Sequence, residues 1–193
     1  MERICVFAGS GSGNRPEFAG AAARLGRLLA ESELGVVFGG GHTGLMGHLA
    51  DAALEAGGRV HGVIPEALWD LELGHEGVTQ LEVVDSMHTR KARMAELADG
   101  FIALPGGIGT LEELFEVFTW AQLGLHRKPC GLLNATGFYD PLIRFLDATV
   151  EEGFLRDDQR QLLVVDGEPG TLVERLAAFH APHIHRWIGP EET

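Results

Sequence analysis

Short apolar runs alternate with longer amphipathic segments along the whole chain. The short runs have the length of strands and are almost continuously apolar, which is typical of strands buried on both faces of a parallel sheet. They cover Ile4–Ala8, Gly35–Phe38, Val60–Ile64, Gln80–Val84, Phe101–Leu104, Cys130–Leu133 and Leu162–Val165. The longer segments have the period of amphipathic helices. They cover Pro16–Glu31, Leu45–Ala56, Met87–Ala98, Thr110–Leu125, Tyr139–Glu151 and Thr171–Phe179.

This alternation predicts an α/β fold: a single doubly wound, Rossmann-like domain whose parallel sheet has helices on both faces. No repeat or change of composition marks a second domain, so we expect one domain over residues 1–188 and a tail over residues 189–193. The segment Glu66–Thr79 is expected to be a long loop. In such folds the ligand lies beyond the carboxyl ends of the strands.

The composition argues against several classes of protein. The net charge is −13, whereas proteins that bind nucleic acid usually present a basic face, so no nucleic-acid partner is expected. No apolar stretch approaches the roughly 20 residues of a membrane helix, and no signal peptide precedes the first strand. Cys5 and Cys130 lie in apolar runs and are expected to be reduced core residues. We therefore expect a cytoplasmic protein without a membrane partner.

Three of the predicted strand-to-helix turns are rich in glycine: Gly9–Gly13, Gly39–Gly44 and Gly106–Thr110. Because the strands are parallel, all three turns fall at one edge of the sheet. Glycine lets backbone amides approach an anion closely, and the following helix adds free N–H groups and the positive end of its dipole. The turns together indicate a site for a phosphorylated small molecule, although each alone could be only a tight connection.

The middle turn matches G-x-G-x-x-G through Gly39, Gly41 and Gly44, as dinucleotide-binding folds do. That fingerprint belongs on the first strand-to-helix turn, where this chain has Asn14 in place of the third glycine. No turn ends in the Gly-Lys-Ser/Thr of a P-loop. A redox cofactor and an ATPase activity are therefore not favoured, and we expect neither a cofactor nor a metal.

The predicted helix that begins at Met87 carries two cations beside its apolar stripe. At about 100° per residue, Met87, Met94 and Leu97 share the stripe, and Arg90 and Lys91 flank it. A charge at the edge of a core requires an anionic partner, because burying it unpaired is costly. A ligand would be such a partner; snorkelling, or pairing with a structural carboxylate, is the alternative.

The next predicted helix has a core stripe of Leu111, Leu114, Phe115, Phe118, Gln122 and Leu125. Glu113, Val117 and Trp120 lie on the opposite side. Apolar side chains beside a carboxylate on an outward face indicate a covered surface, most simply a partner subunit, so we expect a homodimer. Glu113 would then be partly desolvated, as carboxylates that do chemistry often are. Glu112 and Glu116 are expected to stabilise the start of the helix.

These motifs resemble those of the Lonely Guy (LOG) family of nucleotide phosphoribohydrolases, often mislabelled lysine decarboxylases. The family pairs P-G-G-x-G-T-x-x-E, here Pro105–Glu113, with an upstream M-H-x-R-K, here Met87–Lys91. The turn Gly39–Gly47 and residues 119–134 are also similar, and the resemblance covers roughly residues 3–166. It implies hydrolysis of the N-glycosidic bond of a purine nucleoside 5′-monophosphate, often one with an N6-isoprenoid (cytokinin) base. The products are a free base and ribose 5-phosphate.

The resemblance also implies roles for individual residues. Arg90 and Glu113 are the implied catalytic pair, and the turn Gly107–Glu113 holds the phosphoribosyl part of the substrate. The expected substrate-binding residues are Ser10, Gly40, Gly41, Glu72, Lys91, Gly106, Gly107, Ile108, Gly109, Thr110, Leu111, Glu112 and Thr119. The loop that carries Glu72, residues 69–73, departs from the family's usual sequence.

Cleavage of an N-glycosidic bond passes through a ribosyl cation of oxocarbenium character, by analogy with glycosidases. Glu113 would stabilise that charge and orient or deprotonate the attacking water. Arg90 has too high a pKa to act as an acid, so it would anchor the nucleotide and support charge on the departing base. The alternative is a carrier that binds a nucleotide or phosphorylated cofactor without hydrolysis; it has no need of both residues.

Two other activities are not favoured. A pyridoxal-dependent decarboxylase needs a Schiff-base lysine, and this chain, with only Lys91 and Lys128, is short for the folds that usually carry that cofactor. The spacing of His180, His183 and His185 could indicate a metal site, but these residues lie in a tail after the last predicted helix. We expect a structural or surface role for them.

Overall fold

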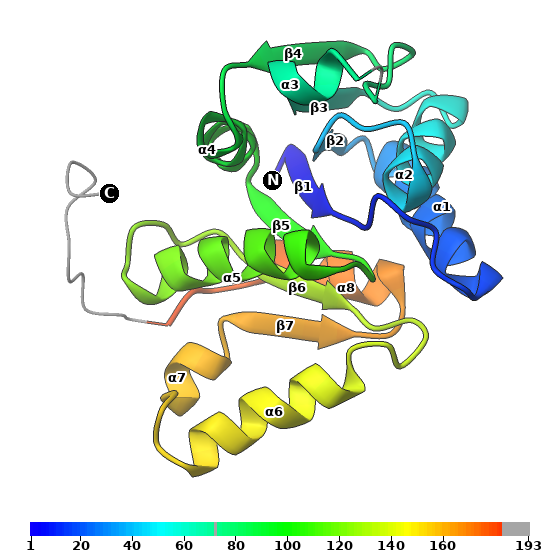
Figure 1. Cartoon of the computed structure of the whole chain (residues 1–193). Coiled ribbons are helices and arrows are strands. Elements are labelled where there is room, and N and C mark those ends of the chain that lie inside the picture. Colours follow the sequence, from blue (N-terminus) through cyan, green and yellow to red (C-terminus); the bar gives the residue numbers. More distant parts are fainter. Residues whose placement is uncertain (72, 183–193) are drawn as a thin grey trace.

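The structure, a computed structural model, describes residues 1–71 and 73–182, which contain one seven-stranded sheet (Figure 1). The strands are β1 Arg3–Phe7, β2 Gly35–Phe38, β3 Val60–Pro65, β4 Gln80–Val84, β5 Gly100–Ala103, β6 Cys130–Leu133 and β7 Leu163–Asp166. They lie in the order β4-β3-β2-β1-β5-β6-β7, and every neighbouring pair is parallel. The chain moves outward from β1 to β4 and returns to the other side of β1 as β5.

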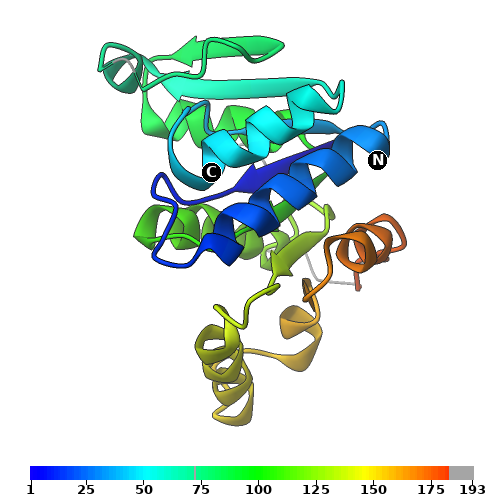
Figure 2. The same cartoon turned by 90° about the vertical axis from the view of Figure 1, so that its right-hand side faces the viewer.

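Helices connect the strands and cover both faces of the sheet. They are α1 Pro16–Glu31, α2 Gly44–Glu55, α3 Glu66–Trp69, α4 Met87–Leu97, α5 Ile108–Gln122, α6 Asp140–Glu151, α7 Asp157–Arg160 and α8 Pro169–Ala177. One face packs against α1, α2 and α8, and the other packs against α4, α5 and α6 (Figures 1 and 2). The predicted doubly wound, Rossmann-like fold is confirmed.

The inner strands are apolar because successive side chains enter two different cores, whereas the edge strand β4 is only half-buried and carries Gln80 and Glu82. Ile4 and Val6 of β1 pack on the side of α1 and α2, whereas Cys5 and Phe7 pack on the side of α4 and α5. Cys5 and Cys130 are buried free thiols, as predicted. Burial raises the pKa of both thiols, that of Cys130 to about 12, so neither is a reactive thiolate.

The predicted bounds lie within two residues of the observed ones, except at the end of α5. This helix ends three residues before Leu125, because Gly124 adopts φ 76° and takes the chain out of the helix. The Gly124 and Leu125 amides then donate to the carbonyls of Ala121 and Trp120. Two short helices were not expected: α3, in the predicted loop, and α7.

The orientation of α5 differs from the prediction. Val117 is only 3% exposed and packs in the core, and Glu113 beside it is also buried. Leu111 and Phe115, expected in the core, are only half-buried. The inward face of the helix meets both the sheet and the charged side chains of α4. Val117 therefore does not mark a subunit interface. Trp120, the other residue behind the predicted homodimer, is half-buried and packs against the same core, so the homodimer stays a prediction.

None of the helices in the described part of the chain is long and apolar enough to cross a membrane. The predicted end of the domain at residue 188 and the tail 189–193 lie outside the described residues.

Candidate active site

The three glycine-rich turns meet at the carboxyl edge of the sheet, next to the point where β1 and β5 lie side by side. The Gly9 amide donates to the Pro105 carbonyl at 3.2 Å, and the Gly9 carbonyl accepts from the Leu45 amide at 3.0 Å. The first turn is thus hydrogen-bonded to both others. This confirms the expected gathering of the turns at the edge where doubly wound folds bind ligands.

A cavity of about 450 Å³ opens between these turns. It is lined by Ala8, Gly9, Ser10, Gly39, Gly41, Thr43, Met46, Ile64, Leu68, Leu73, Met87, Arg90, Gly107, Ile108, Gly109, Thr110, Glu112 and Glu113. Both expected catalytic residues are among them, together with expected substrate-binding residues from all three turns. The volume suits a small organic ligand.

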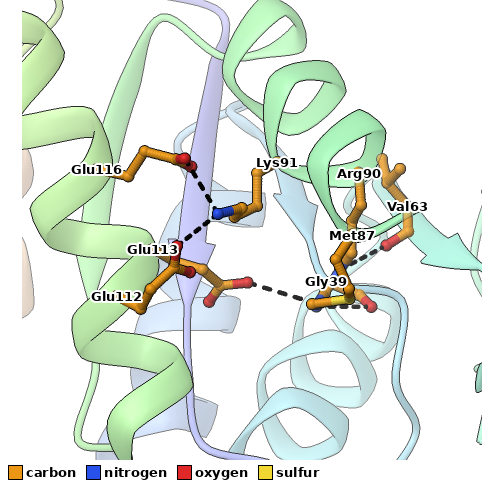
Figure 3. Close-up of polar contacts among 8 residues, drawn as sticks. All are labelled: Gly39, Val63, Met87, Arg90, Lys91, Glu112, Glu113 and Glu116. Atoms are coloured by element: carbon orange, nitrogen blue, oxygen red, sulfur yellow. Dashed lines mark hydrogen bonds and ion pairs between the residues drawn. The ribbon is translucent and has the colours of Figure 1, made fainter.

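Arg90 lies at the floor of the cavity and is only 7% exposed. Its Nε donates to the Val63 carbonyl and its Nη2 to the Gly39 carbonyl, both at 3.1 Å. A β-carbon on Gly39 would overlap Nη2, so glycine is required there for the guanidinium to reach this position. Carbonyls at the ends of β2 and β3 therefore fix the cation, and Nη1 donates to the Met87 sulfur at 3.7 Å and faces Glu113 (Figure 3).

Glu113 faces Nη1 of Arg90 from the second turn of α5. Its Oε1 lies 3.6 Å from Arg90 Nη1, an ion pair too long to be a hydrogen bond. Burial raises the pKa of the Glu113 carboxyl; Arg90 and Lys91 oppose that rise, while Glu112 and Glu116 add to it. The site thus holds a carboxylate that is more basic than an exposed glutamate, beside a fixed cation.

The start of α5 forms the wall next to Glu113. The amides of Ile108, Gly109 and Thr110 belong to the first turn of the helix, where N–H groups have no partner within the helix. A β-carbon on Gly107 or Gly109 would meet nothing within 4 Å, so packing does not demand glycine at either position. The missing side chains leave these amides accessible from the cavity, as anion binding requires.

The strand before this turn is held from behind by Tyr139. The Tyr139 side chain is buried, and its hydroxyl donates to the Leu104 carbonyl at 2.6 Å. Leu104 directly precedes Pro105, so this bond fixes the backbone from which the turn begins.

Some expected substrate contacts are not beside the cavity. Among the described residues, the cavity lining does not include Gly40, Gly106, Leu111, Lys91 and Thr119. Gly40 and Gly106 belong to turns whose neighbouring residues do line it, whereas Thr119 is exposed and lies six residues beyond Glu113 along α5. Glu72 lies outside the described residues.

Lys91 pairs with structural carboxylates, which was the alternative to a ligand in the sequence analysis. Its Nζ lies 2.5 Å from Glu112 Oε1 and 3.0 Å from Glu116 Oε1 (Figure 3). Burial disfavours the Lys91 ammonium, but the hydrogen bonds to Glu112 and Glu116 outweigh it and raise its pKa. The side chain therefore remains a protonated cation.

An apolar wall of the cavity was missed by the sequence analysis. Met87 is 45% exposed at the cavity instead of buried in the core. Leu68 and Leu73 come from α3 and the segment after it, which is tied to the middle turn by a bridge between Gly41 and Gly74. The position of this segment, directly after the carboxyl end of β3, was the one signal that could have placed it at the site.

Residues 1–71 and 73–182 contain no cluster of side chains that suits a metal ion. No group of three or more histidine, cysteine, aspartate or glutamate side chains there is placed to hold an ion. His180 is exposed and its Nδ1 donates to the Ala178 carbonyl. His183 and His185 lie outside the described residues.

Comparison with known proteins places this site in a family. Residues 46–176 match the family model described as possible lysine decarboxylase. The cytokinin riboside 5′-monophosphate phosphoribohydrolase LOG of Oryza sativa subsp. japonica is 49% identical, over 93% of this chain and 74% of that protein. The phosphoribohydrolase LOG7 of Arabidopsis thaliana is also 49% identical, over 93% of this chain and 82% of that protein.

Solved structures share the fold at lower identity. A molybdenum cofactor carrier protein from Chlamydomonas reinhardtii has a TM-score of 0.70 and 21% identity, over 92% of this chain and 99% of that one. A molybdenum cofactor binding protein from Rippkaea orientalis has a TM-score of 0.70 and 22% identity, over 92% of this chain and 96% of that one. The sequence relatives are much more similar than these. The chain therefore belongs to the LOG family, which the family model describes as possible lysine decarboxylases and whose curated members are named phosphoribohydrolases.

Proposed function

We propose that this protein hydrolyses the N-glycosidic bond of a purine nucleoside 5′-monophosphate to a free base and ribose 5-phosphate. One observation carries the proposal: a single cavity joins the amides at the start of α5 to the buried Arg90–Glu113 pair. The curated relatives are named for the same class of reaction on cytokinin riboside 5′-monophosphates.

The phosphate binds the start of α5. The amides of Ile108, Gly109 and Thr110, with the positive end of the helix dipole, supply the donors, so the acidic chain needs no basic cluster there. Ser10, on the first glycine-rich turn, lines the same cavity. The phosphate contact then places the ribose near Glu113, four residues after Gly109.

Glu113 acts on the ribose. As the bond between C1′ and the base lengthens, positive charge develops on C1′ and the ring oxygen, and the carboxylate stabilises it. The same carboxylate orients a water molecule toward C1′ and accepts its proton. The water oxygen becomes the 1-hydroxyl of ribose 5-phosphate. The base leaves with the bonding electron pair and takes up one proton, and Glu113 releases the proton that it took from the water, which restores the carboxylate. The Arg90 guanidinium supports negative charge on the departing base.

The base lies against the apolar wall formed by Met46, Ile64, Leu68, Leu73 and Met87. Such a wall suits a purine and also an apolar substituent on it. We therefore include N6-isopentenyl-AMP with AMP among the candidate substrates.

Release of free base from four compounds tests the proposal: AMP, N6-isopentenyl-AMP and the two matching nucleosides. We expect turnover of at least one nucleotide, with the matching nucleoside far slower because it lacks the phosphate. Equal turnover of adenosine and AMP would contradict the phosphate site. Tight nucleotide binding with no release of base would instead favour the carrier function.

A lysine decarboxylase function is not favoured by the site. A Schiff base requires an uncharged lysine amine facing the cavity. Lys91 is a cation held between Glu112 and Glu116, and it does not line the described cavity.

We also propose a homodimer, on grounds that replace the argument from Val117. Phe145 on α6 is 64% exposed and Phe154, after the same helix, is 87% exposed; such aromatic side chains often mark protein contacts. Sedimentation velocity at micromolar concentration should show a dimer that Phe145→Ser weakens. A monomeric wild type would contradict this.

We also propose that the protein is located in the cytoplasm. Its buried free thiols support a reducing compartment, and cell fractionation would test the location.

A further inference from the structure

Met87, the first residue of α4, brings a thioether to the proposed catalytic pair (Figure 3). It is 45% exposed, and its sulfur accepts a hydrogen bond from Nη1 of Arg90 at 3.7 Å. The other methionines differ from it in burial or in place. Met94 is buried and Met46 is half-buried, whereas Met1 is exposed but precedes β1, at the opposite edge of the sheet. Met87 is therefore the exposed methionine that lies beside the proposed catalytic residues.

The guanidinium of Arg90 is held unequally at its nitrogens. Nε and Nη2 each donate to a backbone carbonyl at 3.1 Å. Within the described part of the chain, Nη1 has longer contacts: the Met87 sulfur at 3.7 Å and Glu113 Oε1 at 3.6 Å. A thioether is a weak acceptor, so it leaves Nη1 available for negative charge on the departing base. A stronger acceptor in place of this sulfur would compete with the base for Nη1.

Oxidation of the sulfur by a hydroperoxide creates such an acceptor. The sulfur electron pair attacks the outer peroxide oxygen, so that an S–O bond forms as the O–O bond breaks. The sulfur loses two electrons, and with hydrogen peroxide the departing hydroxide takes the proton of the transferred oxygen and leaves as water. The sulfoxide is polar where the thioether was apolar. A hydrogen bond from a guanidinium cation to its oxygen is roughly twice as strong as one between neutral groups.

We propose that Met87 is a site of reversible oxidation: a hydroperoxide converts it to the sulfoxide, whose oxygen accepts from Nη1 of Arg90 and withdraws this donor from the reaction. The effect on activity rests on the proposed hydrolase function, whereas the modification itself does not. Methionine sulfoxide reductases return a sulfoxide to the thioether, so the loss of activity is reversible. Cys5 and Cys130 are poor competing targets, because both thiols are buried and protonated.

The first test treats the purified protein with hydrogen peroxide and measures sulfoxide at each methionine by peptide mass spectrometry. The activity of each variant is compared with that of its own untreated sample. Wild-type kcat should fall about 10- to 100-fold in step with oxidation of Met87, as for a misplaced catalytic group. Met87→Leu, which keeps an apolar side chain of similar size, should retain most of its own kcat. Equal inactivation of Met87→Leu, or full activity of wild type oxidised at Met87, would overturn the proposal.

Further controls separate Met87 from the other groups that peroxide could reach. Met1→Leu and Met46→Leu should lose activity as the wild type does, and protection by either would assign the effect elsewhere. A methionine sulfoxide reductase should restore kcat, whereas recovery with dithiothreitol alone would indicate an oxidised cysteine and contradict the proposal. A rise in KM with unchanged kcat would show that the sulfoxide disturbs binding of the base instead of Arg90, which would also overturn it.

A measurement without substrate separates this proposal from the function itself. The 15N signals of the Arg90 side chain, assigned by their loss in Arg90→Lys, can be compared in the unliganded protein before and after oxidation. A new hydrogen bond at Nη1 should shift its signal, and Met87→Leu should show no such shift. An unchanged signal in protein oxidised at Met87 would overturn the proposal. If the shift is found but untreated wild type releases no base, the hydrolase function fails while the capture of Arg90 by oxidised Met87 stands.

Discussion

Two helix pairs cover opposite faces of the same sheet, and their contacts are opposite in kind. Helices α1 and α2 meet through small and apolar residues, so closely that a β-carbon on Gly26 would overlap the carbonyl of Leu49. Helices α4 and α5 instead face each other with ion pairs, among them Arg90–Glu113 and Lys91–Glu112.

The difference shows how one sheet serves stability and chemistry at once. Close apolar contact between α1 and α2 removes surface from water and leaves no space. Charges between α4 and α5 must be partly desolvated, which seldom stabilises a fold. They are, however, what a charge-developing reaction needs. We therefore expect substitutions at the α4–α5 contact to lower activity more than stability, and substitutions at the α1–α2 contact to do the reverse.

The largest expected effect is at Glu113. Glu113→Gln keeps the size of the side chain but removes the charge that stabilises the ribosyl cation, so kcat should fall on the order of 100- to 1,000-fold. Nucleotide affinity, measured by calorimetry, should change much less. Glu96→Gln, on the exposed surface of α4, is the matched control and should retain wild-type turnover. Near wild-type turnover by Glu113→Gln would make the catalytic assignment wrong; joint loss of binding and turnover would make Glu113 a ground-state contact.

Gly39→Ala tests whether the position of the Arg90 guanidinium matters for activity. The added methyl group overlaps the guanidinium, which must leave the Gly39 carbonyl, and a shift of about 1 Å in a catalytic group costs up to about 100-fold in rate. The melting temperature should change less than it does in Gly26→Ala. Gly170→Ala, in helix α8 where a β-carbon meets nothing within 4 Å, should leave activity unchanged and should not destabilise the protein. Unchanged activity in Gly39→Ala would mean that the exact placement of Arg90 is unimportant.

Gly26→Ala addresses the other helix pair. Overpacking against the Leu49 carbonyl should lower the free energy of unfolding by about 1–3 kcal/mol, while kcat per folded molecule stays at the wild-type value. Gly20→Ala in the same helix has room for its methyl group and should stabilise by up to about 1 kcal/mol through helix propensity. The comparison between the two contacts fails if Gly26→Ala lowers kcat without affecting urea denaturation.

The smallest effect expected is in the pH profile of the wild type. Burial raises the pKa of Glu113 above its ordinary value of 4.5, and the reaction needs the ionised form. Activity should therefore decline, as the pH falls, at a higher pH than an exposed glutamate would give. The profile of kcat/KM reports this group in the free enzyme. An acid limb at or below 4.5 would show either that Glu113 is not the titrating group or that Arg90 outweighs its burial.

The elements of the fold could be predicted because their patterns are long and regular. Each inner strand is an apolar run that enters two cores, and each long helix repeats its stripe over several turns. The short helix α3 spans Glu66–Trp69, too few residues to display a period, so the apolar wall that Leu68 and Leu73 bring to the cavity stayed hidden. At the ends of elements, Gly124 marks the end of α5 more reliably than the apolar Leu125 after it.

The position of the glycine-rich turns could be predicted because their motifs fix the backbone. The pairing of side chains could not, because it depends on contacts between helices. The glycine-rich turns had to meet at one edge once the sheet was parallel, and they do. The rotation of α5 was predicted from its largest apolar residues, yet the helix turns Val117 inward together with Glu113, which pairs with Arg90. Nothing in the sequence of α4 alone could show that Lys91 would bind Glu112 and Glu116 across the contact.

Tyr139, which holds the strand below the catalytic turn, is the only tyrosine in the chain. Its hydroxyl can ionise only by giving up the bond to Leu104 and entering water, and burial raises its pKa accordingly. The protein therefore carries an optical reporter at this one corner: in alkali, tyrosinate absorbance appears when the segment beneath the catalytic turn opens. Stopped-flow absorbance would follow that opening without any label.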